Sequence, residues 1–187
     1  MGKAIPNAEI LVVREDGTEC APGEPGELVH RGALVSLGYW NDPEKTAEAY
    51  NERGWSTLGD IGRVDEDGFL YLTDRQSNMI ISGGVNVYPQ EAENVLASHP
   101  EIYDVAVIGI PNEDFGEEVK AVVQVMDGVE TSDETAGALI AYCRERLADI
   151  KCPRSVDFVD ELPRLPTGKL LKRLLKDKYW EGHGSRI

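Results

Sequence analysis

The sequence has little positive charge, few cysteines and no long run of hydrophobic residues. Its 19 lysines and arginines stand against 34 aspartates and glutamates, which gives a formal net charge of −15. Phosphate backbones and anionic lipids repel so acidic a chain, so general binding to nucleic acid or to membranes is not expected. No apolar stretch could span a bilayer, and the start of the chain lacks the apolar core of a signal peptide. We therefore predict a cytoplasmic protein without a transmembrane segment.

Common cofactor and catalytic motifs are missing as well. The three cysteines, Cys20, Cys143 and Cys152, are odd in number, and no pair has the spacing of zinc ligands. We therefore predict no disulfide framework, no metal site and a reducing compartment. GxGxxG, HExxH and GxSxG are absent, and the Gly168-Lys169 pair lacks the flanking residues of a P-loop.

The first 73 residues contain short apolar runs separated by turn signals. Residues 10–13 run into Asp16-Gly17, and a second pair of runs flanks Asp67-Gly68; both dipeptides favour β-hairpins. Asp42, directly before a proline, predicts the N-cap of a short helix. The pattern predicts a small, turn-rich, barrel-like β subdomain over residues 1–73.

From residue 74 onward, runs of strand length are mixed with helical patterns. Two apolar, β-branched runs at residues 105–110 and 119–126 predict strands. Helical patterns begin near residues 89, 133 and 170. We therefore predict an α+β fold in which a lid domain, residues 74–187, has a mixed sheet flanked by helices. No flexible linker separates it from the β subdomain, which favours a hinge over a tether.

One ordered series of short motifs carries the chemical signal. It runs through Gly59-Asp60, Asp74-Arg75, IISGGVNVYPQEAE at 80–93, PNEDFGE at 111–117 and PTGK at 166–169. In this order and spacing the motifs resemble the adenylate-forming superfamily, and most of all its fatty- and aryl-acyl-CoA synthetases. Members carry phosphate-loop and acyl-pocket motifs upstream that this sequence does not contain. The resemblance therefore implies a C-terminal portion: the last β subdomain of the large AMP-binding domain, followed by the C-terminal lid domain.

The resemblance implies that three residues serve the nucleotide and the hinge. Asp60 matches the aspartate that accepts hydrogen bonds from the ribose hydroxyls of ATP, and Arg75 matches the arginine that reaches the ribose and phosphates. Asp74 matches the hinge aspartate. By themselves, Asp60 would be read as a turn residue and Arg75 as half of a surface salt bridge. Leu58 stands where many relatives have threonine, which removes a hydroxyl near the phosphates.

The resemblance assigns CoA and the acid to the lid. Gly83 and Gly84 match the glycines beside which the pantetheine arm of CoA enters; without the series they would be read as a turn. Val85 stands where many relatives have glutamate. Lys169 matches the catalytic lysine that the lid brings to the carboxylate and the α-phosphate. The nearby cations Lys172, Arg173 and Lys176 are read as a solvated helix face. A second reading, with less support in the sequence, has these residues, Lys151 and Arg164 bind the phosphates of CoA.

The implied activity belongs to a longer parent protein. That protein would be an acid–CoA ligase that uses Mg²⁺-ATP, a carboxylic acid and CoA, with no tightly bound cofactor in this chain. The partner of this chain would be the missing N-terminal domain that binds ATP and the acyl group, and the isolated chain is expected to be inactive. Two alternatives stay open: an adenylation module that loads a carrier protein, and a non-catalytic binding or regulatory fragment. The identity of the acid is not encoded here.

Overall fold

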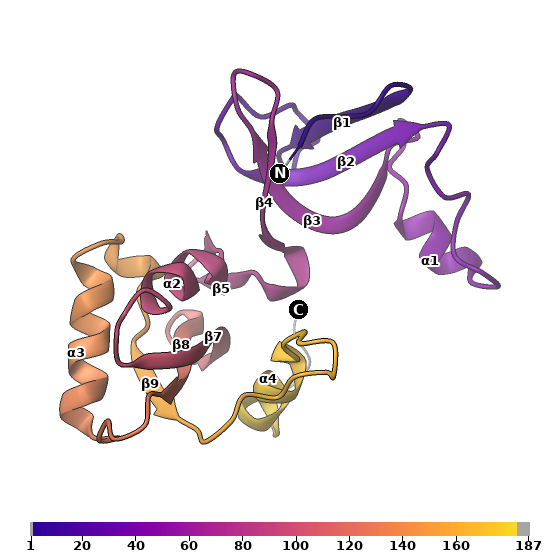
Figure 1. Cartoon of the computed structure of the whole chain (residues 1–187). Coiled ribbons are helices and arrows are strands. Elements are labelled where there is room, and N and C mark those ends of the chain that lie inside the picture. The colour runs from indigo at the N-terminus through magenta and orange to yellow at the C-terminus, as the bar shows by residue number, and fades with distance from the viewer. Residues whose placement is uncertain (1, 183–187) are drawn as a thin grey trace. The chain divides into compact units, whose positions relative to one another are not determined.

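A computed structural model describes residues 2–182 of the chain. The chain forms two compact units, which divide between Ser77 and Asn78. Each unit has its own sheet, and most of the helical residues belong to the second unit (Figure 1). The predicted α+β class is therefore confirmed. The assignment of residues 1–73 and 74–187 to two family domains stays a prediction.

The first unit is built on a four-stranded antiparallel sheet in the order β1-β2-β3-β4. Its strands are β1 (Ala8–Val13), β2 (Gly26–Gly32), β3 (Ser56–Val64) and β4 (Leu70–Arg75). A single bridge joins Gly2 to Leu70. Within residues 2–182, β1 and β4 do not pair along their length. The subdomain that the sequence predicts to be barrel-like is therefore an open sheet and not a closed barrel. Its small core contains Val13, Val29 and Trp55.

The predicted turns and helix of this unit are present. At Asp16-Gly17 the Arg14 N–H donates to the Thr18 carbonyl at 2.8 Å, but the main partner of β1 is β2, which follows a longer loop. Helix α1 (Pro43–Glu48) begins as expected, because the Asp42 carboxylate accepts from the Lys45 N–H at 3.0 Å. The tight turn between β3 and β4 contains Gly68, whose φ is +80°.

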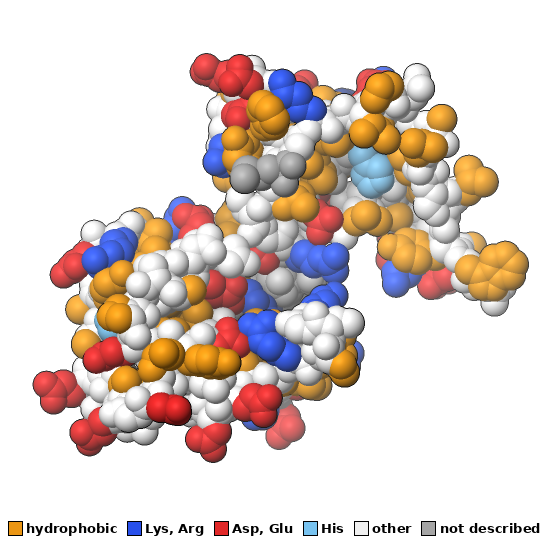
Figure 2. All heavy atoms as spheres, in the orientation of Figure 1, with side chains coloured by type: hydrophobic (Ala, Val, Ile, Leu, Met, Phe, Trp, Pro, Cys, Tyr) orange, Lys and Arg blue, Asp and Glu red, His pale blue; other side chains and the backbone are white. Residues whose placement is uncertain are grey.

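Large hydrophobic side chains lie exposed on the first unit, around the segment that leads into α1 (Figure 2). Leu37 and Trp40 are 98% and 99% exposed, and Leu34 is 74% exposed. We call these three residues the apolar loop. Clustered exposed side chains of this size are typical of a surface that another protein part covers.

The second unit contains a five-stranded sheet whose central strand is β8. Its strands are β5 (Ile80–Ser82), β6 (Val85–Val87), β7 (Ile102–Asn112), β8 (Gly116–Val125) and β9 (Ser155–Phe158). β8 pairs antiparallel with β7 and parallel with β9. The predicted mixed sheet is therefore confirmed.

Helices cover both faces of this sheet. They are α2 (Pro89–Leu96), α3 (Asp133–Arg144) and α4 (Lys172–Trp180), with short 3₁₀ turns at η1 (Gln76–Asn78) and η2 (Asp149–Lys151). Val105 and Val107 pack in one core with residues of α2 and α3, whereas Ala106 and Ile108 pack in a second core with Leu175 of α4. Alternate residues of β7 therefore face opposite layers, which explains the continuous apolar run in its sequence. Within the described part of the chain, no helix is long and apolar enough to cross a membrane.

A partly buried ion pair between β8 and β9 accepts a hydrogen bond from α4. Lys120 of β8 is 7% exposed and bonds Asp157 of β9, and the Tyr179 hydroxyl of α4 donates to the same carboxylate. Partial burial raises the pKa of Asp157, but the hydrogen bonds from Lys120 and Tyr179 outweigh it, and the net shift is downward. Polar contacts thus fix the helix that follows Lys169 in the chain.

We expect the cysteines to differ sharply in reactivity. Cys143 and Cys152 are buried, whereas Cys20 is partly exposed. Burial raises the pKa of all three thiols, that of Cys143 to about 11. Because the thiolate is the reactive form, Ellman's reagent at pH 8 should label Cys20 first and the other two only after unfolding. A Cys20→Ser variant should show no rapid labelling. Fast labelling of two thiols in that variant would contradict the packing around α3.

Candidate functional site

The first unit brings two of the predicted site residues together. The β3–β4 register pairs Asp60 with Arg75, and the Arg75 Nε lies 3.3 Å from the Asp60 Oδ1. Gly59, directly before Asp60, has a φ of +71°, a conformation that glycine adopts without strain. The arrangement places a carboxylate and a guanidinium side by side, with 21% and 57% of the side chains exposed. Such a pair can accept hydroxyl hydrogens and donate to anionic oxygens at one place.

The hydroxyl that Leu58 lacks is not supplied by the neighbouring Thr57, whose own hydroxyl is already hydrogen-bonded. Leu58 is 62% exposed, so its side chain fills no core position. The hydroxyl of Thr57 donates to Glu27 at 2.8 Å and accepts from the Gly59 N–H at 3.0 Å. Thr57 therefore fixes the backbone beside Asp60.

Asp74 lies inside a paired strand. It is opposite Ile61 in the β3–β4 register, and its Oδ1 accepts from the Arg75 N–H at 2.7 Å. The division between the compact units comes three residues later, after Ser77 and within the 3₁₀ turn η1. The role of Asp74 as the hinge stays a prediction.

In the second unit, Gly83 and Gly84 form the tip of a β-hairpin. Ser82 of β5 pairs with Val85 of β6, so the loop contains two residues, with φ values of +57° and +78°. Two positive φ values in a two-residue loop define a type I′ turn, which favours Gly-Gly. Gly83 also has a packing reason, since a Cβ there would lie 3.1 Å from the Phe115 ring. The turn that these glycines suggest by themselves is therefore present, and the CoA role stays a prediction.

Lys169 follows the tip of a second, smaller hairpin. The Gly168 N–H donates to the Leu165 carbonyl at 2.8 Å, and the Leu165 N–H donates to the Lys169 carbonyl at 2.9 Å. Pro166 presets the turn and Gly168 has a φ of +84°, a pattern typical of a three-residue hairpin loop. Lys169 is exposed. We call residues 165–169 the lysine turn.

The neighbouring cations differ from the solvated face that the sequence predicts. Arg173 is exposed, but Lys176 is buried, and Lys172 bonds Glu93 at 2.7 Å with only 11% and 9% of the two side chains exposed. The prediction is wrong for both lysines, because α4 turns these positions toward the sheet and α2. Periodicity within α4 alone does not reveal a partner such as Glu93, which comes 79 residues earlier.

Other cations considered for CoA phosphates already have acidic partners. The Lys151 ammonium bonds both oxygens of Glu91, at 2.8 and 2.7 Å.

Arg154, which sequence reasoning did not single out, lies over the Phe115 ring at 4.1 Å from its centroid. Since Phe115 also packs against Gly83, Arg154 belongs to the surroundings of the Gly83-Gly84 turn.

Comparison with known proteins gives a consistent answer. Residues 91–169 match the family model of the AMP-binding enzyme C-terminal domain. A 2-succinylbenzoate–CoA ligase of Geobacillus kaustophilus is 49% identical over 175 residues, which are 94% of this chain and 35% of that protein. A long-chain-fatty-acid–CoA ligase of Escherichia coli O157:H7 is 42% identical over 178 residues, 95% of this chain and 31% of that protein.

A solved structure agrees with the sequence relatives. ATP-bound MatB from Rhodopseudomonas palustris has a TM-score of 0.87 at 36% identity, over 95% of this chain and 35% of that chain. The chain thus spans about a third of the length of the curated relatives it matches. It belongs to the adenylate-forming superfamily, and it corresponds to the C-terminal part of the acyl-CoA ligases in that superfamily.

Proposed function

We propose that the complete protein is a carboxylic acid–CoA ligase that works through an acyl-adenylate. In the first step a carboxylate oxygen of the acid attacks the α-phosphorus of ATP, and pyrophosphate leaves. In the second step the CoA thiolate attacks the acyl carbon, AMP leaves, and the thiol proton passes to solvent. The observation that carries this proposal is that nearly the whole chain aligns, at 42–49% identity, with two proteins named as CoA ligases. CoA is preferred over a carrier protein as the acceptor for the same reason.

Lys169 is proposed as the catalytic cation of the first step. That step brings two anions together and builds negative charge around phosphorus. An exposed ammonium at the end of a hydrogen-bonded turn can be presented to this charge without reorganisation of its support.

Asp60 and Arg75 are proposed as the nucleotide-binding pair. The Asp60 carboxylate would accept both ribose hydroxyls, and the neighbouring Arg75 would donate to the ribose and phosphate oxygens. Their separation of 3.3 Å keeps the arginine fork beside the carboxylate. Gly83 and Gly84 are proposed to line the path of the CoA arm, where the lack of side chains permits close approach to the backbone. Asp74 is the proposed pivot between the two steps.

The proposal requires parts that this chain does not supply. The apolar loop around Leu37 and Trp40 is proposed to pack against the N-terminal domain that binds ATP and the acid. Mg²⁺ is proposed to enter with the ATP phosphates, because among residues 2–182 no group of three His, Cys, Asp or Glu side chains is arranged to hold a metal ion. Use of ATP and CoA is consistent with a cytoplasmic location, which we also propose.

The isolated 187-residue chain should not catalyse adenylation. Its sequence offers Asp60, Arg75 and Lys169 but none of the phosphate-loop or acyl-pocket motifs. Exchange of labelled pyrophosphate into ATP, with fatty and aromatic acids, should therefore stay at the level of a blank. Circular dichroism would verify that the chain is folded, and robust exchange by the folded chain would contradict this division of labour.

The function itself is tested with the full-length enzyme. Incubation with Mg²⁺-ATP, CoA and a panel of carboxylic acids should yield AMP, pyrophosphate and a thioester in equal amounts for at least one acid. Omission of CoA should leave the acyl-adenylate on the enzyme. Formation of ADP and phosphate in place of AMP and pyrophosphate would rule out the proposal.

A further inference from the structure

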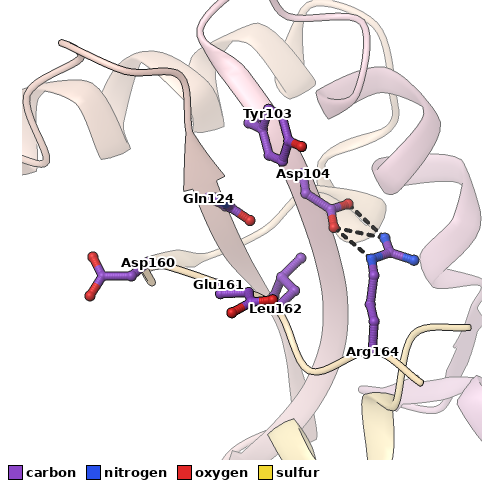
Figure 3. A pocket seen from close by; sticks show the side chains of 7 residues that line it. All are labelled: Tyr103, Asp104, Gln124, Asp160, Glu161, Leu162 and Arg164. Atoms are coloured by element: carbon purple, nitrogen blue, oxygen red, sulfur yellow. Dashed lines mark hydrogen bonds and ion pairs between the residues drawn. The ribbon is translucent and has the colours of Figure 1, made fainter. Parts of the chain in front are cut away.

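An ion pair anchors the start of the lysine turn to strand β7 of the second unit. The Arg164 Nε and Nη2 donate to the two carboxylate oxygens of Asp104 at 2.9 and 2.8 Å (Figure 3). Asp104 belongs to β7, whose residues 105–108 are completely or almost completely buried. Both residues line an open pocket of about 520 Å³. The ion pair holds Arg164 in a fixed position relative to the sheet.

The same guanidinium also reaches the turn itself. The Arg164 Nη1 donates to the Gly168 carbonyl at 2.6 Å, and Gly168 immediately precedes Lys169. One planar side chain thus uses three donors, two on the sheet and one on the turn. A lysine could not do the same, because its ammonium is a single point on a flexible stem.

Asp104 is itself oriented by its strand. Its Oδ1 accepts from the Val105 N–H at 2.9 Å, and the β7–β8 register shifts between Ile102 and Asp104. A bulge of this kind re-aims a side chain that would otherwise follow the regular alternation. Asp104 is only 22% exposed, in contrast with the acidic members of ordinary surface pairs on this chain, such as Asp149 at 79%.

The segment that follows the lysine turn is anchored as well. Lys172, three residues after Lys169, bonds the buried Glu93 of α2 at 2.7 Å. The Glu93 Oε1 also accepts from the Val107 N–H of β7 at 2.7 Å. Both ends of the segment that carries Lys169 are therefore connected to β7, while the turn between them is exposed.

We propose that Asp104 and Arg164 are positioning residues for the Lys169 ammonium. Through the Gly168 carbonyl they hold the lysine turn in one orientation, so that the lid delivers Lys169 to the reacting atoms without a search over turn conformations. This inference rests on the proposed function of Lys169. It gives Arg164 a different role from that of a CoA phosphate ligand, since its donors face Asp104 and the turn.

The first experiment tests the hold on the turn, independently of any activity. In the 187-residue chain, Arg164→Ala and Asp104→Ala should raise amide hydrogen exchange across residues 165–171 by about tenfold or more, while the β7–β8 ladder keeps its protection. Arg144→Ala is the matched control, because it removes another ion pair, with Asp149 at 2.9 Å, that contacts no part of the turn. Unchanged exchange in both variants would overturn the inference.

The second experiment measures the two half-reactions in the full-length enzyme. Arg164→Ala and Asp104→Ala should each lower the rate of adenylation by about 10- to 100-fold, the scale expected for a misplaced catalytic group. Thioester formation from acyl-adenylate supplied beforehand should keep its rate and its KM for CoA. The double variant should be no slower than the single variants, because both remove one contact system, and Arg164→Lys should recover part of the rate.

Three outcomes would count against positioning. A wild-type adenylation rate in Arg164→Ala, with Lys169→Ala inactive, would overturn the role of the ion pair alone. A raised KM for CoA with slowed thioester formation would instead make Arg164 a phosphate ligand. Wild-type adenylation in Lys169→Ala would overturn both this inference and the proposed function on which it rests.

Discussion

Lys169→Ala in the full-length enzyme is expected to lower the rate of adenylation by about 10²–10³-fold, the typical cost of losing one group that stabilises charge in a transition state. The structure of the lysine turn does not depend on the side chain of Lys169. Its hydrogen bonds connect the backbone of Leu165, Gly168 and Lys169, and the Lys169 side chain is exposed. Alanine therefore removes the charge and leaves the turn in place. The melting temperature should be unchanged.

The two half-reactions separate the charge effect from a general defect. Thioester formation from acyl-adenylate supplied beforehand should largely survive in Lys169→Ala, since the proposed lid rotation has by then withdrawn the lysine. Lys178→Ala is a suitable control, because Lys178 is an exposed lysine in the last turn of α4. An equal loss in both half-reactions would contradict a mechanism with two lid orientations.

Strands, helix starts and turns could be predicted from the sequence where the residues of the element itself indicate its conformation. The apolar runs at 105–110 and 119–126 correspond to β7 and β8, and the proline at 89 begins α2. The exact turns at Gly83-Gly84 and Gly168 follow from the need for positive φ. In these cases the backbone geometry is determined within a few residues of the signal.

Contacts between distant segments were not predictable in this way. β6 (Val85–Val87) has only three residues and is stabilised by pairing with β5, so its run is too short to be recognised. Lys172 and Lys176 look like solvent-facing residues within α4, and only the fold turns them inward. The Asp104–Arg164 pair joins residues 60 positions apart. Motif matching finds Lys169, but the parts that hold it in place emerge from packing.

The first unit shows the same distinction between a residue and its partner. Asp60 and Arg75 are singled out by motifs on separate strands, and the hairpin at Gly68 sets the register that makes them neighbours. The apolar loop, in contrast, has no partner within the described residues, and its side chains are exposed. A single sequence indicates that such residues are hydrophobic, but it does not indicate which surface covers them.

Asp74→Pro is expected to trap the lid in one orientation and to slow transfer of the acyl group to CoA by about 100-fold, on the scale of a misplaced reacting group. Proline fixes φ near −65° and removes the N–H, so one of the two dihedrals that a pivot needs can no longer change. Thr73 before it already lies in β4, and proline favours extended geometry in the preceding residue. We expect the trapped orientation to be the adenylating one, so acyl-adenylate should still form.

Because Asp74 is paired with Ile61, a proline there can also disturb the sheet, and controls must separate this effect from a blocked pivot. Asp74→Ala keeps both dihedrals free and should change the rates far less. Gln76→Pro places proline at the first position of η1, where a helical turn tolerates it, and tests the boundary beyond the strand. Single-turnover kinetics of each half-reaction, with thermal melting as a folding control, distinguish the sites. A folded Asp74→Pro enzyme with wild-type transfer, beside a Gln76→Pro enzyme that stalls, would move the pivot from Asp74 to the end of the first compact unit.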